Sequence, residues 1–270
     1  MRGIKLLVSD IDGTLVDKDK RLAPATVDAV RRLKAAGLGF TIISARPRSG
    51  MMPIADMLEI DEPMGAFNGG IVFKRDGTVI EHHMIKPEVA RGAMAIVGDA
   101  KVDTWVFAGD VWYASTDQGD HVGSERKASA QGPVVIDDFA ALLGKADKIT
   151  FVSDDEALLR DLHAKVAAEF DAKATIVQSQ TYYLDITPVE GNKGTGICEL
   201  AEAFGVALAQ TAAIGDQAND IAMLKRAGLA IAMGNASADV RAVVHEVTSA
   251  NDADGVAHAI DTFILTGVPA

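Results

Sequence analysis

The chain has 270 residues, of which 49% are apolar and 24% are charged, and its formal net charge is −12 at pH 7. This composition is typical of a soluble globular protein with room for one large domain or two of moderate size. The acidic field repels nucleic acid and anionic membranes, so we expect neither as a partner. It also repels phosphate esters, so a site for such a ligand needs a local cation or a metal ion.

Cysteine usage and the first apolar run indicate the cytoplasm. Cys198 is the only cysteine, which excludes a disulfide within the chain and suits a reducing compartment. The apolar run over residues 4–8 is too short for a signal sequence or a membrane span, and Asp10 follows it closely. We therefore expect a cytoplasmic protein, either a monomer or a homodimer.

The first 82 residues predict alternating strands and helices. Residues 4–8 suit a strand that is buried on both faces. Residues 24–36 predict a helix, because an apolar stripe follows a proline near the first helical position. The further expected elements are a strand at 40–44, a helix at 49–58, a strand at 64–67 and a β-hairpin at 71–81 that turns at Asp76-Gly77.

The C-terminal part, residues 188–270, repeats this alternation. Alternating strands and helices predict a parallel sheet with helices on both faces, so we expect an α/β, Rossmann-like core. The elements expected here are helices at 194–204, 218–227, 237–245 and 254–265, with strands at 211–214 and 229–233.

The intervening residues, 83–187, have a different texture and contain both tryptophans and all three tyrosines. Paired strands joined by tight turns predict an antiparallel sheet covered by helices. We expect an α+β domain of residues 83–187, inserted into a core of residues 1–82 and 188–270. Its expected elements are helices at 87–98, 137–143 and 155–169, a strand at 148–152, and strand pairs within 104–115 and 174–187.

Two carboxylates, Asp10 and Asp12, directly follow the first expected strand in the segment Asp-Ile-Asp-Gly-Thr. With a period of two, both side chains project to the same side, and Gly13 allows the chain to turn sharply. Ligands of open parallel sheets bind beyond the carboxyl ends of the strands, which is where this pair falls. The alternative for this segment alone is an ordinary acidic turn.

Ser44 and Lys193 stand at comparable places. Ser44 ends the second expected strand and could donate to a phosphate oxygen, although this residue taken alone favours a cap of the next helix. Lys193 opens a helix, where its charge opposes the helix macrodipole. An anion between the lysine and the helix end would resolve that conflict, and a solvated lysine in a glycine-rich turn is the alternative.

A third and a fourth carboxylate, Asp216 and Asp220, follow another expected strand, with Asn219 between them. Hard oxygen ligands suit Mg²⁺, which keeps several waters and bridges to substrate phosphate. An Asp/Asn-rich turn that caps the next helix is the alternative. Because all four segments meet one edge of the expected sheet, together they predict a phosphate and magnesium site.

The order and spacing of these four segments resemble the motifs of the haloacid dehalogenase (HAD) superfamily, and most closely its Cof-type phosphatases with an inserted type IIB cap. Residues 1–82 and 188–265 carry the resemblance, and the cap agrees in size and position only. The tail segments 232–236 and 249–256 also match. One departure is Ala45, where the family usually has glycine; the larger residue could narrow the space beside the phosphate.

The resemblance implies a Mg²⁺-dependent phosphatase of small phosphorylated metabolites, with sugar phosphates as the leading class. It implies that Asp10 attacks phosphorus to give an aspartyl-phosphate, and that Asp12 is the general acid and then the general base. The further implied roles are charge neutralisation by Lys193, phosphate binding by Ser44, Arg46 and Asn219, and metal binding by Asp10, the Asp12 backbone carbonyl, Asp216 and Asp220.

Two alternatives stay open on the same core: a phosphotransferase or phosphomutase, and a non-catalytic sugar-phosphate sensor. The intact carboxylate set argues against the sensor. We expect the inserted domain to choose the substrate, because the core recognises only the phosphoryl group. Aromatic and histidine side chains there are candidates for sugar contacts, with packing of the cap core as the alternative for each: Trp105, Trp112, Tyr113, His121, Tyr182 and Tyr183.

Overall fold

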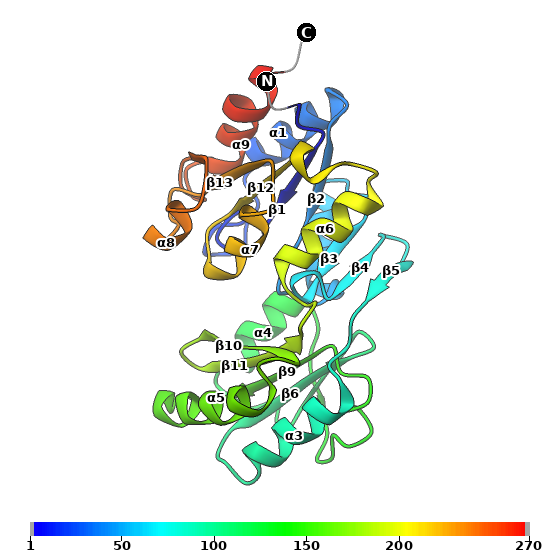
Figure 1. Cartoon of the computed structure of the whole chain (residues 1–270), viewed down its shortest axis with the longest axis vertical. Helices are drawn as coiled ribbons and strands as arrows, with labels where there is room; N and C mark the ends of the chain where they lie inside the picture. The colour runs from blue at the N-terminus through cyan, green and yellow to red at the C-terminus, as the bar shows by residue number, and fades with distance from the viewer. Residues whose placement is uncertain (1–2, 268–270) are drawn as a thin grey trace. The chain divides into compact units, whose positions relative to one another are not determined.

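The computed structural model describes residues 3–267, whose contacts divide the chain into two compact units (Figure 1). The core unit comprises the described residues up to Ala45, Met52–Glu81 and the described residues from Asn192 onward. The inserted unit comprises Arg46–Met51 and His82–Gly191, and it contains the segment 83–187 expected to form the inserted domain.

A five-stranded parallel sheet, in the order β14-β13-β12-β1-β2, forms the centre of the core unit (Figure 1). All four residues of β1 are buried, as expected for a strand covered on both faces. The strands are β1 (Leu6–Ser9), β2 (Gly39–Ile42), β12 (Thr211–Gly215), β13 (Leu229–Ala232) and β14 (Glu246–Val247).

Helices cover both faces of this sheet. Helices α6 (Lys193–Ala203), α7 (Ile221–Leu224) and α8 (Ala238–Arg241) share an apolar cluster with residues of β1, β12 and β13. Helices α1 (Pro24–Ala35) and α9 (Gly255–Ala259) contact each other on the opposite face (Figure 1). The predicted Rossmann-like α/β core is therefore confirmed.

A small antiparallel sheet in the order β3-β4-β5 follows α2 (Arg48–Met57) in the chain. Its strands are β3 (Met64–Ala66), β4 (Ile71–Phe73) and β5 (Val79–His82). The hairpin turns at Asp76-Gly77 as predicted, with the Gly77 N–H donating to the Lys74 carbonyl at 2.9 Å. Strand β5 is at the edge of this sheet, and all of its residues are exposed, so it adds little to the core.

The inserted unit is built on a six-stranded sheet in the order β10-β11-β9-β6-β7-β8, antiparallel except for the β7–β8 pair. Helices α3 (Pro87–Val97) and α5 (Glu156–Phe170) share an apolar core with this sheet, which confirms the expected helix-covered antiparallel sheet. The remaining elements are β6 (Asp103–Ala108), β7 (Val111–Ala114), α4 (Val122–Ser129), β8 (Val134–Val135), β9 (Lys148–Val152), β10 (Ala174–Gln180) and β11 (Tyr183–Pro188).

The helix predicted over residues 137–143 is wrong, because this segment forms turns. The Asp138 carboxylate accepts from the Ala140 N–H at 2.8 Å, and the Leu142 N–H donates to the Phe139 carbonyl at 2.8 Å. Such local bonds compete with the helical pattern. Phe139 and Leu142 are nevertheless buried in the core of the inserted unit, which explains the apolar spacing that suggested a helix.

Three predicted helices of the core unit differ from the structure near their ends. Residues 218–227 begin as a 3-10 turn, Ala218–Asp220, and the helix predicted over 237–245 ends at Arg241. The helix predicted over 254–265 continues beyond α9 as a π-helical turn, Ile260–Ile264. The strands β8 and β14 have two residues each, too few to leave an alternating pattern.

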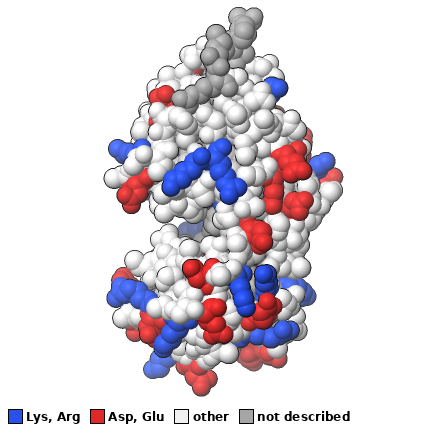
Figure 2. Space-filling model, in the orientation of Figure 1, with Lys and Arg blue, Asp and Glu red and all other residues white. Residues whose placement is uncertain are grey.

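No helix among residues 3–267 is long and apolar enough to cross a membrane. On the face of the molecule drawn in Figure 2, basic side chains gather at the centre of the upper part and acidic side chains to their right, whereas both kinds are mixed in the lower part.

We expect Val8→Ala to lower the free energy of unfolding by about 2–3 kcal/mol, because it removes fully buried methyl groups from β1 and leaves a cavity. Val79→Ala is the matched control, since Val79 is 42% exposed on β5 and should change stability by less than about 0.5 kcal/mol. Urea-induced unfolding measures both variants. Equal losses would contradict the assignment of the core.

Candidate active site

Two paired strands bring Asp10 and Asp216 to the same edge of the sheet. Asp10 directly follows β1, and its N–H donates to the Ile214 carbonyl at 3.0 Å. Asp216 directly follows β12, which pairs with β1 in parallel. Both carboxyl groups are buried, and Asp10 is only 4% exposed. The prediction that these two segments meet beyond the strand ends is confirmed.

Lys193 joins Asp10 to Asp220 from the first residue of α6. Asn192 caps this helix, because its side-chain oxygen accepts from the Thr195 N–H at 3.0 Å. The Lys193 ammonium, in a side chain only 1% exposed, contacts Asp10 Oδ1 and donates to Asp220 Oδ1 at 2.6 Å. The carboxylates of Asp10 and Asp220 therefore supply the negative charge that offsets an unfavourable lysine at the start of a helix.

Asp220 also holds the segment that carries Asp216. Its Oδ2 accepts from the N–H groups of Asp216 and Gln217, both at 2.8 Å. This approach requires a glycine at position 215, since a Cβ there would lie 2.5 Å from Asp220 Cγ. Both carboxylate oxygens of Asp220 therefore already accept hydrogen bonds. These bonds give Asp220 a structural role, which is to hold the segment around Asp216.

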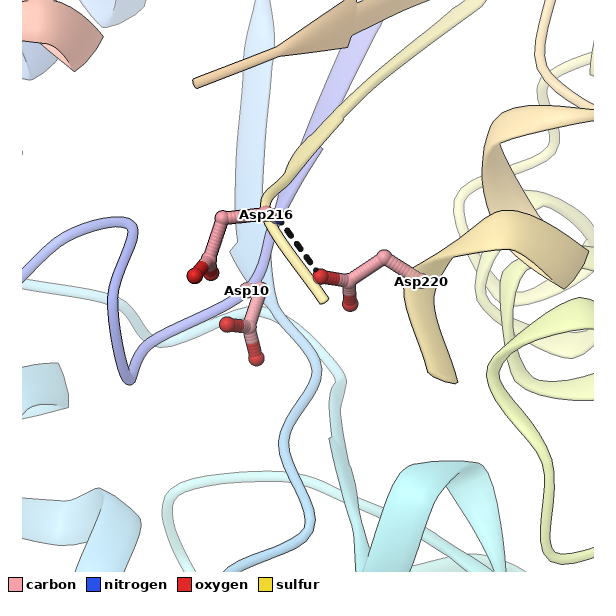
Figure 3. A group of neighbouring side chains, drawn as sticks. All are labelled: Asp10, Asp216 and Asp220. Atoms are coloured by element: carbon pink, nitrogen blue, oxygen red, sulfur yellow. Dashed lines mark hydrogen bonds between the residues drawn. The ribbon is translucent and has the colours of Figure 1, made fainter. Parts of the chain in front are cut away.

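Three carboxylates converge on one point. Oxygens of Asp10, Asp216 and Asp220 lie within 4.8 Å of one another. Figure 3 shows Asp10 and Asp216 side by side, with Asp220 reaching toward them from the next turn. Lys193 supplies one positive charge against three negative ones, so two negative charges are in excess when all are ionised. A buried oxygen-donor set with this excess could hold a divalent cation.

The same burial shifts the acid–base equilibria. Burial raises the pKa of Asp10 to about 8, and Asp220 adds to this effect while Lys193 opposes it. Burial and the nearby Asp220 also raise the pKa of Asp216, against hydrogen bonds from Thr14 and Gln217. Burial lowers the pKa of Lys193, but Asp10 and Asp220 outweigh it and raise that pKa, so the ammonium stays charged.

Asp216 is held by residues for which the sequence pattern predicted no role. Thr14 Oγ1 donates to Asp216 Oδ1 at 2.9 Å, and Gln217 Nε2 donates to Oδ2 at 3.0 Å. Asn235 Nδ2 donates to the Gly13 carbonyl at 2.9 Å and lies 3.3 Å from Asp216 Oδ2. Asn235 falls within a matching tail segment, so the sequence did carry a signal for it.

Asp12 differs from the three buried carboxylates in its exposure. Its side chain is 35% exposed and its Oδ1 accepts from Lys20 Nζ at 2.5 Å. The backbone carbonyl of Asp12 was the predicted metal ligand, and this metal contact stays a prediction. Nothing in the sequence pattern had indicated Lys20.

The predicted phosphate-binding residues fall into two groups. Ser44 is buried beyond β2, where its N–H donates to the Gly65 carbonyl at 2.9 Å, and Asn219 Nδ2 donates to Asn68 Oδ1 at 3.1 Å. Arg46 belongs to the inserted unit, where its Nη1 donates to the Gly50 carbonyl at 3.0 Å. The phosphate-binding roles of Ser44, Arg46 and Asn219 stay predictions.

Known proteins resemble this chain over nearly its whole length. Residues 7–260 match the family model of haloacid dehalogenase-like hydrolases. The HMP-PP phosphatase of Escherichia coli O6:H1 is 28% identical over 245 residues, which cover 88% of this chain and 87% of that protein. A haloacid dehalogenase-like hydrolase from Bacteroides thetaiotaomicron superposes with a TM-score of 0.87 at 25% identity, covering 96% of this chain and 98% of its own.

A further solved structure is that of a HAD subclass IIB sugar phosphatase. It superposes with a TM-score of 0.83 at 26% identity, and the match covers 96% of this chain and 98% of that chain. Because the match covers nearly all of both chains, it includes the core unit and the inserted unit.

We expect Gly13→Ala to weaken divalent-cation binding roughly tenfold or more, because a Cβ at this position would overlap the Asp216 carboxylate. Gly77→Ala is the matched control. Both glycines have left-handed φ angles, +81° and +89°, but a Cβ at Gly77 would meet no atom of the described residues within 4 Å.

Both variants should lose about 1–2 kcal/mol of stability from the left-handed backbone alone. Only Gly13→Ala should also lose cation affinity. Calorimetric titration measures the affinity, and equal affinities in the two variants would contradict the placement of Gly13 against Asp216.

Proposed function

Because this chain belongs to the haloacid dehalogenase-like hydrolase family and is a phosphatase of that family, we propose that it hydrolyses phosphate monoesters of small metabolites. The proposed route is a phosphorylated Asp10 intermediate. Sugar phosphates are the leading substrate class, since a relative of similar fold is a sugar phosphatase. The HMP-PP phosphatase of Escherichia coli O6:H1 supports a small phosphorylated substrate in general.

The observation that carries this proposal is the buried contact of Lys193 with both Asp10 and Asp220 beside Asp216. A carboxylate is a weak nucleophile toward a phosphate dianion unless positive charge is close by. Lys193 supplies such a charge directly on Asp10 and holds its carboxyl group in place. An acidic turn without function would have no need to bury this ammonium.

The two aspartates have distinct roles, and both act in each half-reaction. Asp10 attacks phosphorus, and the bond from phosphorus to the leaving oxygen breaks as the new bond forms. Asp12 donates a proton to that leaving oxygen. Asp12 then accepts a proton from the water that cleaves the aspartyl-phosphate and restores Asp10. Ser44, Arg46 and Asn219 are proposed to hold the phosphoryl oxygens.

The excess negative charge of the buried carboxylates fits Mg²⁺ as the cofactor. Asp10, the Asp12 backbone carbonyl and Asp216 would hold it, with Asp220 as a further ligand or as support for Asp216. Bound there, the ion supplies charge neutralisation to the phosphoryl group. The acidic chain as a whole would repel a phosphate ester, but Lys193 and a bound metal ion would make the potential at the site positive.

We propose that the inserted domain, residues 83–187, selects the substrate. The roles proposed for the residues of the core involve only the phosphoryl group, which all substrates share. A panel of phosphorylated metabolites tests this proposal by release of inorganic phosphate in the presence of Mg²⁺. Release from sugar phosphates above other esters is the expected result. A phosphomutase or phosphotransferase would instead release little phosphate while consuming substrate.

We expect Asp10→Asn to lower turnover at least roughly 10³-fold, because an amide cannot form the acyl-phosphate. Phosphate release measures turnover, and thermal unfolding checks that the variant folds. Asp61→Asn is the control, since Asp61 is 83% exposed and lies outside the site. Near-normal activity of Asp10→Asn would overturn the nucleophile assignment.

Removal of divalent cations with a chelator should abolish phosphate release, because the buried carboxylates then lack their counter-charge. Addition of excess Mg²⁺ should restore it. Assays before and after dialysis against the chelator make the comparison. Activity that persists in the metal-free enzyme would contradict the metal role.

A further inference from the structure

Asn235 belongs to the turn that follows β13, and this turn packs closely against the segment that follows β14. The Gly234 N–H donates to the Ser249 carbonyl at 2.9 Å. A Cβ on Gly234 would lie only 2.6 Å from the Ala250 nitrogen, so a glycine is needed where the two segments meet. This packing brings the side chain of Asn235 to the carboxylate of Asp216.

The amide of Asn235 connects three segments of the core unit. Its Oδ1 accepts from the Asn251 N–H at 3.0 Å. A backbone N–H can only donate, so the amide atom that meets it is the oxygen, and the amide nitrogen faces the other two partners. Both of these are acceptors: the Gly13 carbonyl at 2.9 Å and Asp216 Oδ2 at 3.3 Å. The hydrogen-bond network therefore fixes the orientation of the amide.

Asn235 restrains Asp216 in a way that the other donors do not. Gln217 Nε2 donates to Asp216 Oδ2 at 3.0 Å, but Gln217 is the next residue in the chain and can move together with Asp216. Thr14 Oγ1 donates to Oδ1 at 2.9 Å from the loop after β1. Asn235 comes from a third segment and holds that same loop at the Gly13 carbonyl, so it fixes the loop and the carboxylate together.

Stability does not account for these bonds. Asn235 is exposed, and it lines a hollow of about 390 Å³ together with Gly13, Asp216 and Asn251. Water competes for the hydrogen bonds of an exposed amide, so their net contribution to the free energy of unfolding is small. Groups that hold a carboxylate ligand in place contribute instead to the affinity of a metal site.

We propose that Asn235 is a positioning residue of the cation site, which holds the Asp216 carboxylate in place relative to the turn at Gly13. The amide nitrogen has no lone pair to offer a cation, and the oxygen accepts from the Asn251 N–H, so Asn235 acts through Asp216. Without the amide, the carboxylate loses one of its restraints and the oxygen ligands are less well arranged for Mg²⁺. This inference rests on the proposed function, in which Asp216 is a ligand of Mg²⁺.

Asn251 offers a matched control. Its Nδ2 donates to the Val16 carbonyl at 2.8 Å, so its side chain also connects a C-terminal segment to the loop after β1. Within residues 3–267 that side chain has no hydrogen bond to Asp216. Asn235→Ala and Asn251→Ala therefore each remove one bond to a carbonyl of the same loop, and only Asn235→Ala also removes a bond to Asp216.

The experiment titrates Mg²⁺ into wild-type protein and both variants by calorimetry without substrate, so the result does not depend on turnover. We expect Asn235→Ala to raise the dissociation constant for Mg²⁺ roughly tenfold or more, and Asn251→Ala to change it less than about twofold. Urea-induced unfolding in the presence of a chelator should give the two variants similar midpoints, because each loses hydrogen bonds of a side chain that water reaches.

An unchanged dissociation constant in Asn235→Ala, or the same increase in both variants, would overturn the positioning role. A large drop of the urea midpoint in Asn235→Ala alone would also overturn it, because the residue would then serve the fold.

Release of inorganic phosphate tests the proposed function separately. If wild-type protein hydrolyses esters with Mg²⁺ and Asn235→Ala binds Mg²⁺ as tightly as wild type, the function stands and only the role of Asn235 fails. If wild-type protein binds no Mg²⁺, the metal role and this inference fail together.

Discussion

The contact of one buried ammonium with two carboxylates fixes the rest of the site. Lys193 meets Asp10 and Asp220, so it connects the end of β1, the start of α6 and the turn after β12. Charges this deeply buried are unfavourable unless each has its partner. The three segments must therefore keep fixed positions relative to one another. A site assembled from distant parts of the chain requires such fixed positions.

Two glycines, one in the turn after β1 and one at the end of β12, make this convergence possible. At Gly13 a side chain would overlap Asp216, and at Gly215 it would press on Asp220. Because β1 and β12 pair in parallel, the sheet brings both segments to one edge, and the two glycines allow the carboxylates to approach closely. The excess negative charge that results is unfavourable for folding alone, and such local conflicts are expected where a protein binds or reacts.

The sequence allowed the meeting of Asp10, Lys193 and Asp216 to be predicted, because each stands at the end of a strand or the start of a helix. The support from Thr14 and Asn235 depends on side-chain contacts that no periodic pattern encodes. The turns at 137–143 were predicted as a helix for a related reason. Phe139 and Leu142 have helical spacing and are buried, but a hydrogen bond to Asp138 favours turns.

Two carboxylates of one short motif occupy opposite environments. Asp10 is 4% exposed and lies against Lys193, whereas the side chain of Asp12 is 35% exposed and lies against Lys20. A group that attacks phosphorus benefits from a site without competing water, while a group that exchanges protons with water needs access to it. Pairs of titratable groups divide acid–base work when their surroundings differ in this way. The different exposure of the two side chains therefore fits the roles that the proposed reaction gives to the two aspartates.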